Sequence, residues 1–204
     1  MFATSLAAAA TLATSAQAGT GTILYDTATG PYGGYNGLNY FQYFADSFST
    51  GPSAFDLTDI HFILTSISGG PTDIAVFLYS DNGTNLGAQI AQLTGVPQTF
   101  TSGNQDFDFT GNVELSANTR YWALITGESY SFAGVDYTAN LTGAEATTEF
   151  WTAQQDNGYN LGIIPNGGNV PSMEVVGVPA PEPTTVALAG LAGTAWLLRQ
   201  RKQA

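Results

Sequence analysis

The chain has 204 residues and a formal net charge of −12, and three of its four basic residues lie within the last six positions. No nucleic-acid partner is expected, because affinity for phosphate backbones comes from Lys and Arg. The absence of cysteine excludes disulfides, thiolate metal sites and cysteine nucleophiles. A content of 24 glycines and only 10% charged residues is typical of a turn-rich all-β protein.

The N-terminal segment predicts an export signal. Residues 2–15 are small or apolar, and Ala16-Gln17-Ala18 fits the A-x-A pattern that signal peptidase cleaves. We interpret residues 1–18 as a signal peptide, with signal peptidase as a partner; the alternative is a buried helix. No basic residue precedes the apolar stretch, so we expect the true start codon to lie upstream.

The sequence pattern of residues 19–177 predicts a single β domain. Short apolar or alternating runs are separated by turn clusters, and no run keeps a helical period. Ile60, Phe62 and Leu64, for example, take one face of a strand. The predicted fold is all-β, an antiparallel, jelly-roll-like β-sandwich. The expected strands are Thr22–Tyr25, Tyr40–Phe48, Leu57–Ser66, Thr72–Ser80, Ala88–Thr94, Gln105–Phe109, Val113–Leu115, Thr119–Thr126, Ser129–Tyr137, Glu149–Thr152 and Ser172–Val178.

Catalytic motifs are missing from this domain. His61 is the only histidine, and no nucleophile elbow, zinc-protease motif or phosphate-binding loop occurs. We therefore expect His61 to be a surface or packing residue and the protein not to be an enzyme. Asp106 and Asp108 share a strand face and would suit glycoside hydrolysis. Because Phe107 and Phe109 take the opposite, core face, we interpret both aspartates as part of a solvated edge.

Two loops carry the oxygen donors that Ca²⁺ prefers. They contain Asp81-Asn82-Gly83 and Asp156-Asn157-Gly158, and neither completes an EF-hand. The same tripeptide is a common tight turn. The turn interpretation is favoured, calcium remains the alternative, and no other cofactor is expected.

Aromatic residues give the remaining indication of a ligand. A segment rich in Gly and Asn contains Tyr32, Tyr35 and Tyr40. Exposed rings in such a segment can stack on sugars, although packing duty is favoured for most of them. Arg120, next to Tyr121 and Trp122, is expected to form an ion pair or to stack on a ring.

The C-terminal segment predicts a sorting tail. Residues 178–183 form a proline-rich linker through which no strand should continue. An apolar helix from Thr184 to Leu198 follows and ends at Arg199, Arg201 and Lys202. Fifteen helical residues span about 22 Å, less than the roughly 30 Å hydrocarbon core, so insertion needs thinning or snorkelling. The basic tail should stay cytoplasmic.

This tail resembles the PEP-CTERM sorting signal of Gram-negative bacteria. The resemblance covers residues 178–204 and rests on Pro181-Glu182-Pro183, an apolar helix with interior glycines, and an arginine-rich end. It implies an exosortase-type sorting enzyme as a partner and transient anchoring in the inner membrane. The destination would be the cell surface, outer membrane or extracellular matrix. The alternative is a plain tail anchor.

The β domain is similar to the choice-of-anchor extracellular domains. The similarity spans roughly residues 40–137, including Val76-Phe77-Leu78-Tyr79 and Thr119-Arg120-Tyr121-Trp122. It implies a surface-displayed antiparallel sandwich and transfers no catalytic residues. We expect a structural or adhesive protein of an exopolysaccharide-rich envelope, with exopolysaccharide as a further partner. A carbohydrate-binding module is the alternative, and a polysaccharide-active enzyme ranks third.

Overall fold

The computed structural model describes residues 21–181, apart from residues 31, 39–41, 66–73, 84, 97–102, 128–132, 139–148, 155–161 and 167–168. These described residues form thirteen strands, all paired antiparallel, and no helix, so the predicted all-β class is confirmed. The strands are β1 (Thr22–Asp26), β2 (Tyr32–Leu38), β3 (Tyr43–Ser49), β4 (Phe55–Thr65), β5 (Ile74–Asp81), β6 (Leu86–Gly95), β7 (Gln105–Leu115), β8 (Arg120–Gly127), β9 (Ala133–Thr138), β10 (Phe150–Gln154), β11 (Ile164–Pro165), β12 (Val170–Pro171) and β13 (Met173–Pro179).

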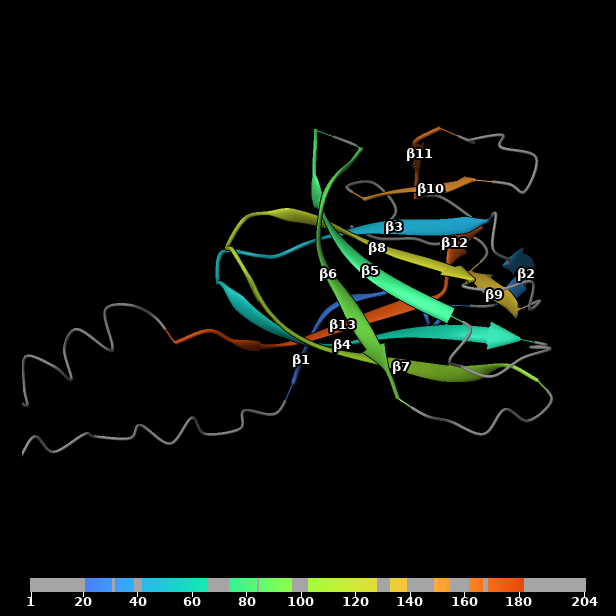
Figure 1. Ribbon diagram of the computed structural model, residues 1–204, viewed down its shortest axis with the longest axis horizontal. Coiled ribbons are helices and arrows are strands. Elements are labelled where there is room, and N and C mark those ends of the chain that lie inside the picture. The colour runs from blue at the N-terminus through green and yellow to red at the C-terminus, as the bar shows by residue number, and fades with distance from the viewer. Residues whose placement is uncertain are drawn as a thin grey trace, which may run out of the picture.

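The strands form one sheet that curls into two layers (Figure 1). The first layer contains β1, β13, β4 and β7 in that order, and the second contains β6, β5, β8, β3, β10 and β11. The layers are joined at β6, which pairs with β5 along most of its length and with β7 at Thr94 and Gly95. Beyond the start of β13, strand β9 pairs with the last two residues of β4, Leu64 and Thr65, and β2 and β12 pair with β9.

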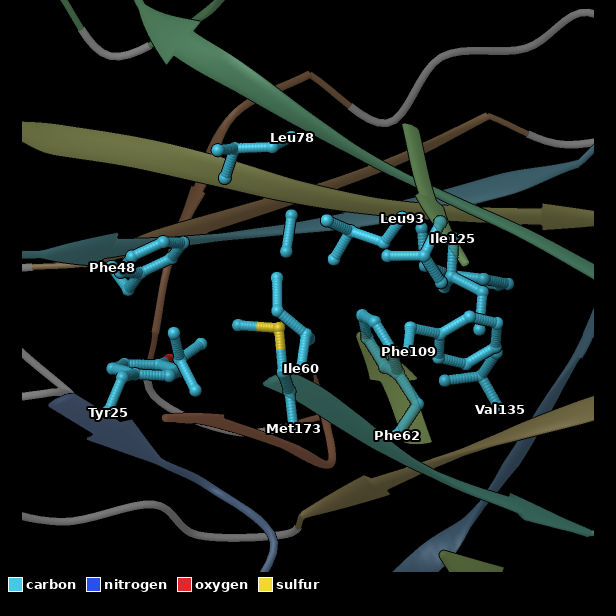
Figure 2. Close-up of a cluster of buried hydrophobic side chains, with 14 of the residues drawn as sticks. Tyr25, Phe48, Ile60, Phe62, Leu78, Leu93, Phe109, Ile125, Val135 and Met173 are labelled. Carbon is cyan, nitrogen blue, oxygen red and sulfur yellow. The ribbon is translucent and has the colours of Figure 1, made fainter. Parts of the chain in front are cut away.

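Apolar side chains fill the space between the layers (Figure 2). Ile60, Phe62 and Leu64 of β4 are fully buried, as their alternation predicts. The rings of Phe62 and Phe109 meet edge to face with centroids 6.5 Å apart, and Figure 2 shows them beside Val135. Burial of this size is the main favourable contribution to the stability of such a domain.

The outer face of the second layer carries a separate apolar cluster. Its fully or nearly buried members are Ala45, Trp122 and Leu124. Arg120 lies at its margin, with Nε 3.1 Å from Oε2 of Glu149 and Cζ 5.0 Å from the ring centroid of Phe150. The prediction for Arg120 is therefore confirmed, because it forms both an ion pair and a ring contact.

Most expected strands are observed with ends shifted by a few residues, and the larger differences concern the number and continuity of strands. Strands β2, β11 and β12 were not predicted. The two expected strands Gln105–Phe109 and Val113–Leu115 form one strand, β7, because a bulge opposite Leu57 and Asp59 absorbs an extra residue of β7. Gly111 suits this bulge, since a Cβ added there would lie 2.6 Å from Leu93 Cδ2.

The last strand ends inside the linker. β13 extends to Pro179, one residue beyond the expected end at Val178, with Val178 paired to Asp56 and Pro179 to Phe55. Ala180 and Pro181, the last described residues, are not part of a strand, in line with the prediction that no strand continues through the linker. Proline is tolerated at position 179 because β1 pairs with β13 only as far as Gly177. No neighbouring strand therefore needs the backbone N–H that proline lacks. The next residue, Ala180, still donates its N–H to the Ala54 carbonyl at 3.0 Å.

Candidate functional site

Ionisable side chains lie in a row across the outer face of the first layer. Asp26 of β1 is in register with Glu174 of β13, Glu174 with His61 of β4, and His61 with Asp108 of β7. Residues in register on neighbouring strands share a face, and their sequence neighbours, such as Phe62 and Phe107, point into the core. The only histidine is therefore flanked by the carboxylates of Glu174 and Asp108, and a third carboxylate, Asp26, lies beyond Glu174.

His61 and Asp108 form the closest contact in this row. Nδ1 of His61 lies 2.7 Å from Oδ1 of Asp108, and the two side chains are 26% and 36% exposed. This contact orients the imidazole and leaves Nε2 as its second polar atom. Asp106 and Asp108 point outward and keep contact with solvent, as predicted, while Phe107 and Phe109 are buried. Asp108 is not at the edge of the sheet, because β4 pairs with β7 on one side and Val96 donates its N–H to the Asp108 carbonyl on the other. His61 is a surface residue with a partner, in line with its interpretation from the sequence.

A depression of about 180 Å³ opens beside this pair. Such a volume holds roughly six water molecules and is smaller than a drug-sized pocket. The strands β2, β4, β7 and β13 and the turn after β1 contribute its walls. It is lined by Ala28, Thr29, Tyr32, His61, Ile63, Asp106 and Glu174. Tyr32, which is 48% exposed, presents an accessible aromatic ring at its border.

The depression has a negative potential. Burial raises the pKa of Glu174, and the charges of Asp26 and Asp106 raise it further, while His61 acts in the opposite direction. The pKa of Tyr32 is also raised, first by burial and then by Asp106, Asp136 and Asp26. Both groups therefore resist acquiring negative charge, mainly because burial disfavours the charged form and secondly because carboxylates lie nearby.

Asp136 lies close to this depression and is almost completely buried, at 2% exposure. Its Oδ2 has no hydrogen-bond partner, and burial raises its pKa to about 6. Backbone hydrogen bonds connect it with the lining, because Ser172 donates to the Asp136 carbonyl and Ile63 donates to the Ser172 carbonyl. A buried carboxylate without a partner adds to the negative potential around Tyr32.

These residues favour recognition of a polar ligand. Carboxylates and the Thr29 hydroxyl accept hydrogen bonds from hydroxyl or amino groups, and the Tyr32 ring offers an apolar surface. Within the described part of the chain, no three His, Asp or Glu side chains are grouped so that they could hold a metal ion. Sequence analysis named His61, Asp106, Asp108 and Tyr32 separately but missed Glu174, Asp26 and Asp136.

A second polar cluster lies between the layers and is closed to solvent. Asp46 is fully buried, and burial raises its pKa well above the usual range, although hydrogen bonds from Tyr25 and Asn166 act in the opposite direction. Two buried polar atoms, Nε1 of Trp151 and Oδ1 of Asn166, have no partner. Its position in the interior indicates a structural role.

The first of the two loops considered for calcium forms a turn. Oδ1 of Asp81 accepts a 2.8 Å hydrogen bond from Nε1 of Trp122, and Oδ2 accepts one of 3.0 Å from the N–H of Gly83. Asn82 donates its N–H to the Asn85 carbonyl, and Gly83 has a positive φ of 71°. This geometry supports the turn interpretation. Asp156 and Asn157 lie outside the described residues.

Most of the predicted sorting and cleavage residues also lie outside the described residues. They are Ala16, Ala18, Glu182, Pro183, Arg199, Arg201 and Lys202. Pro181 is described and is exposed. A search for membrane-spanning helices, made only among the described residues, finds none. No protein-family model matches the sequence, and no curated protein has a significantly similar sequence.

Proposed function

We propose that the protein is an exported surface or extracellular-matrix protein with a structural or adhesive role. The observation that carries this proposal is the order of its parts along the chain. The Ala16-Gln17-Ala18 cleavage signal comes first, a β domain of curled antiparallel sheet follows, and Pro181-Glu182-Pro183 begins two residues after the end of β13. An apolar segment and a basic tail complete the order.

Each part has a proposed role in this scheme. Signal peptidase removes residues 1–18, and residues 178–204 act as the PEP-CTERM signal that an exosortase-type enzyme recognises. The helix after Pro183 holds the protein in the inner membrane until sorting, and Arg199, Arg201 and Lys202 keep its end cytoplasmic. The β domain, a jelly-roll-like sandwich, then contacts exopolysaccharide outside the cell without catalysing a reaction.

Intact-mass spectrometry of protein recovered from its native envelope tests the sorting proposal. We expect a mature chain that begins near Gly19 and ends within the proline-rich linker. Replacing Pro181, Glu182 and Pro183 with alanine should leave the C-terminal tail attached. The matched control replaces Thr184 and Thr185, which follow the tripeptide, and should mature normally. Normal maturation and delivery of the tripeptide variant would overturn the sorting proposal.

Carbohydrate binding is the second candidate function, and the exposed ring of Tyr32 at the border of the polar depression favours it. A ring beside hydrogen-bonding groups is suited to a sugar, because one face of a sugar ring is apolar and its rim carries hydroxyl groups. Saturable binding to immobilised glycans should weaken at least tenfold in Tyr32→Ala. Tyr35→Ala is the control, because Tyr35 lies on the same strand and is more exposed but does not line the depression. Equal loss in both variants would place the binding elsewhere.

A further inference from the structure

The depression on the first layer combines three properties that together define a class of ligand. Its potential is negative, since the carboxylates of Asp106 and Glu174 line it and those of Asp26 and Asp136 lie close by. Its border carries the half-exposed ring of Tyr32. No described residue hydrogen-bonds to the carboxylate of Glu174, which leaves a half-buried acceptor facing the ligand space.

The potential selects against anions and favours a cation. Each anionic group brought here would be repelled by several carboxylates, whereas an ammonium group would be attracted by them and by the face of an aromatic ring. Carboxylate contacts to a charged donor are also stronger than contacts to a neutral one. The unpartnered, buried Asp136 reinforces this preference, because its charge acts on Tyr32 from below the surface.

The acceptors and the aromatic ring lie on different strands, which favours a ligand with several donors and an apolar face over a lone cation. Glu174 lies on β13 and Asp106 on β7, and β4 runs between these two strands. Two strand spacings separate their backbones by about 10 Å, and Asp106 is also offset along β4 because it pairs with Ile63 whereas Glu174 pairs with His61. A sugar ring carries donors at several positions, so it can contact Glu174, Asp106 and the Thr29 hydroxyl together and still present a face to Tyr32.

We propose that this depression binds a sugar ring that carries a free amino group. The ammonium group contacts Glu174, hydroxyl groups contact Asp106 and Thr29, and one face of the ring packs against Tyr32. This inference rests on carbohydrate binding as the second candidate function and names the ligand class of that site. It is independent of the sorting proposal.

NMR titration of the full-length chain provides the test, because His61 is the only histidine and gives a single imidazole signal. The probes are D-glucosamine, N-acetyl-D-glucosamine, D-glucuronate and free lysine, at slightly below neutral pH so that amino groups are protonated. We expect a saturable shift with D-glucosamine and a dissociation constant at least tenfold lower than that for N-acetyl-D-glucosamine. Lysine, which lacks the ring, should bind at least tenfold more weakly than D-glucosamine, and D-glucuronate should not bind.

A pair of charge variants assigns the contact. Glu174→Gln removes the charge and keeps the shape of the side chain, so it should lower the affinity for D-glucosamine to that for N-acetyl-D-glucosamine. Glu114→Gln is the control, because Glu114 is exposed on the same strand as Asp106 but about 26 Å further along it. Thermal melting of both variants verifies that they fold.

The outcomes separate the inference from the function on which it rests. Equal affinity for D-glucosamine and its N-acetyl derivative overturns the ammonium assignment and leaves carbohydrate binding standing. Equal affinity for lysine and D-glucosamine overturns the inference that the ligand is a sugar ring. A His61 signal that no sugar shifts overturns both the inference and carbohydrate binding at this depression.

Discussion

Oδ2 of Asp46 accepts a 2.7 Å hydrogen bond from the hydroxyl of Tyr25, and this bond connects β3 of the second layer with β1 of the first. Nδ2 of Asn166 lies 2.6 Å from the same hydroxyl and 3.1 Å from Oδ1 of Asp46. The layers are joined through β6 at the middle of the strand order, whereas β1 and β11 lie at its two ends. The polar cluster therefore ties together the two ends of the curled sheet, which no strand pairing joins.

Removing the Tyr25 hydroxyl should destabilise the fold. Tyr25→Phe leaves the buried carboxylate of Asp46 and the amide of Asn166 each without one partner, which costs about 1–3 kcal/mol of unfolding free energy. Urea unfolding measures this difference. Tyr79→Phe is the control, since the Tyr79 hydroxyl makes only an exposed 3.5 Å contact with Gln89 and its loss should have little effect. Equal effects of the two variants would contradict a structural role for the cluster.

Asp136 should make stability depend on pH. Its folded-state pKa of about 6 exceeds the unfolded value of about 3.9, so the folded state binds the proton more tightly between these values. Stability is therefore expected to fall as pH rises through this window and to level off above it. Asp136→Asn, which cannot ionise, should raise the melting temperature at neutral pH more than at pH 4.

Other groups contribute to the pH dependence of the unmodified protein. The pKa values of Asp46 and Glu174 are also raised by burial, so they give a change in the same direction. The difference between wild type and Asp136→Asn at each pH isolates Asp136. A difference that stays constant from pH 4 to neutral pH would show that Asp136 keeps the same charge in both states.

The regular strands could be predicted because the alternation of inward and outward side chains that marks a strand can be read from neighbouring residues alone. The spacing of Ile60, Phe62 and Leu64 at every second position predicts both a strand and its buried face. Strand β2 has the sequence YGGYNGL, whose three glycines oppose strand formation, and it is held by pairing with β9, which is distant in the sequence. The continuity of β7 depends likewise on a bulge that only the pairing with β4 defines.

The candidate site depended on register rather than on any local motif. His61 and Asp108 are recognisable in the sequence as polar residues on the outer faces of their strands. Their contact requires β4 and β7 to pair in one particular register, and the addition of Glu174 requires β13 to pair on the other side of β4. A shift of one residue in any of these strands would turn its carboxylate or imidazole toward the core. Glu174 is the only ionisable residue of β13. This was the only feature of the sequence that could have indicated its place in the site.

The Arg120–Glu149 pair should respond asymmetrically to mutation. The Glu149 side chain is 4% exposed and that of Arg120 is 24% exposed. Arg120→Met leaves a buried carboxylate with the Ser47 hydroxyl as its remaining partner, at a cost of about 3 kcal/mol. Glu149→Gln should cost less, about 1 kcal/mol, because Arg120 can turn to solvent and keep its contact with Phe150.

A double-mutant cycle measured by urea unfolding checks this assignment. The double variant should be less destabilised than the sum of the two single variants, because the buried charge is then absent. Additive effects would mean that the two side chains do not interact.

The His61–Asp108 pair should contribute little to stability despite its short distance. Both side chains keep about a quarter to a third of their surface in contact with solvent, where pairs of opposite charge are worth about 0–1 kcal/mol. His61→Gln and Asp108→Asn are each expected to change the unfolding free energy by less than about 1 kcal/mol, and added salt should reduce the change further. A loss above about 2 kcal/mol would make the pair part of the structural framework. A small loss means that these variants keep the sheet intact, so any change they cause in ligand binding reports on the depression itself.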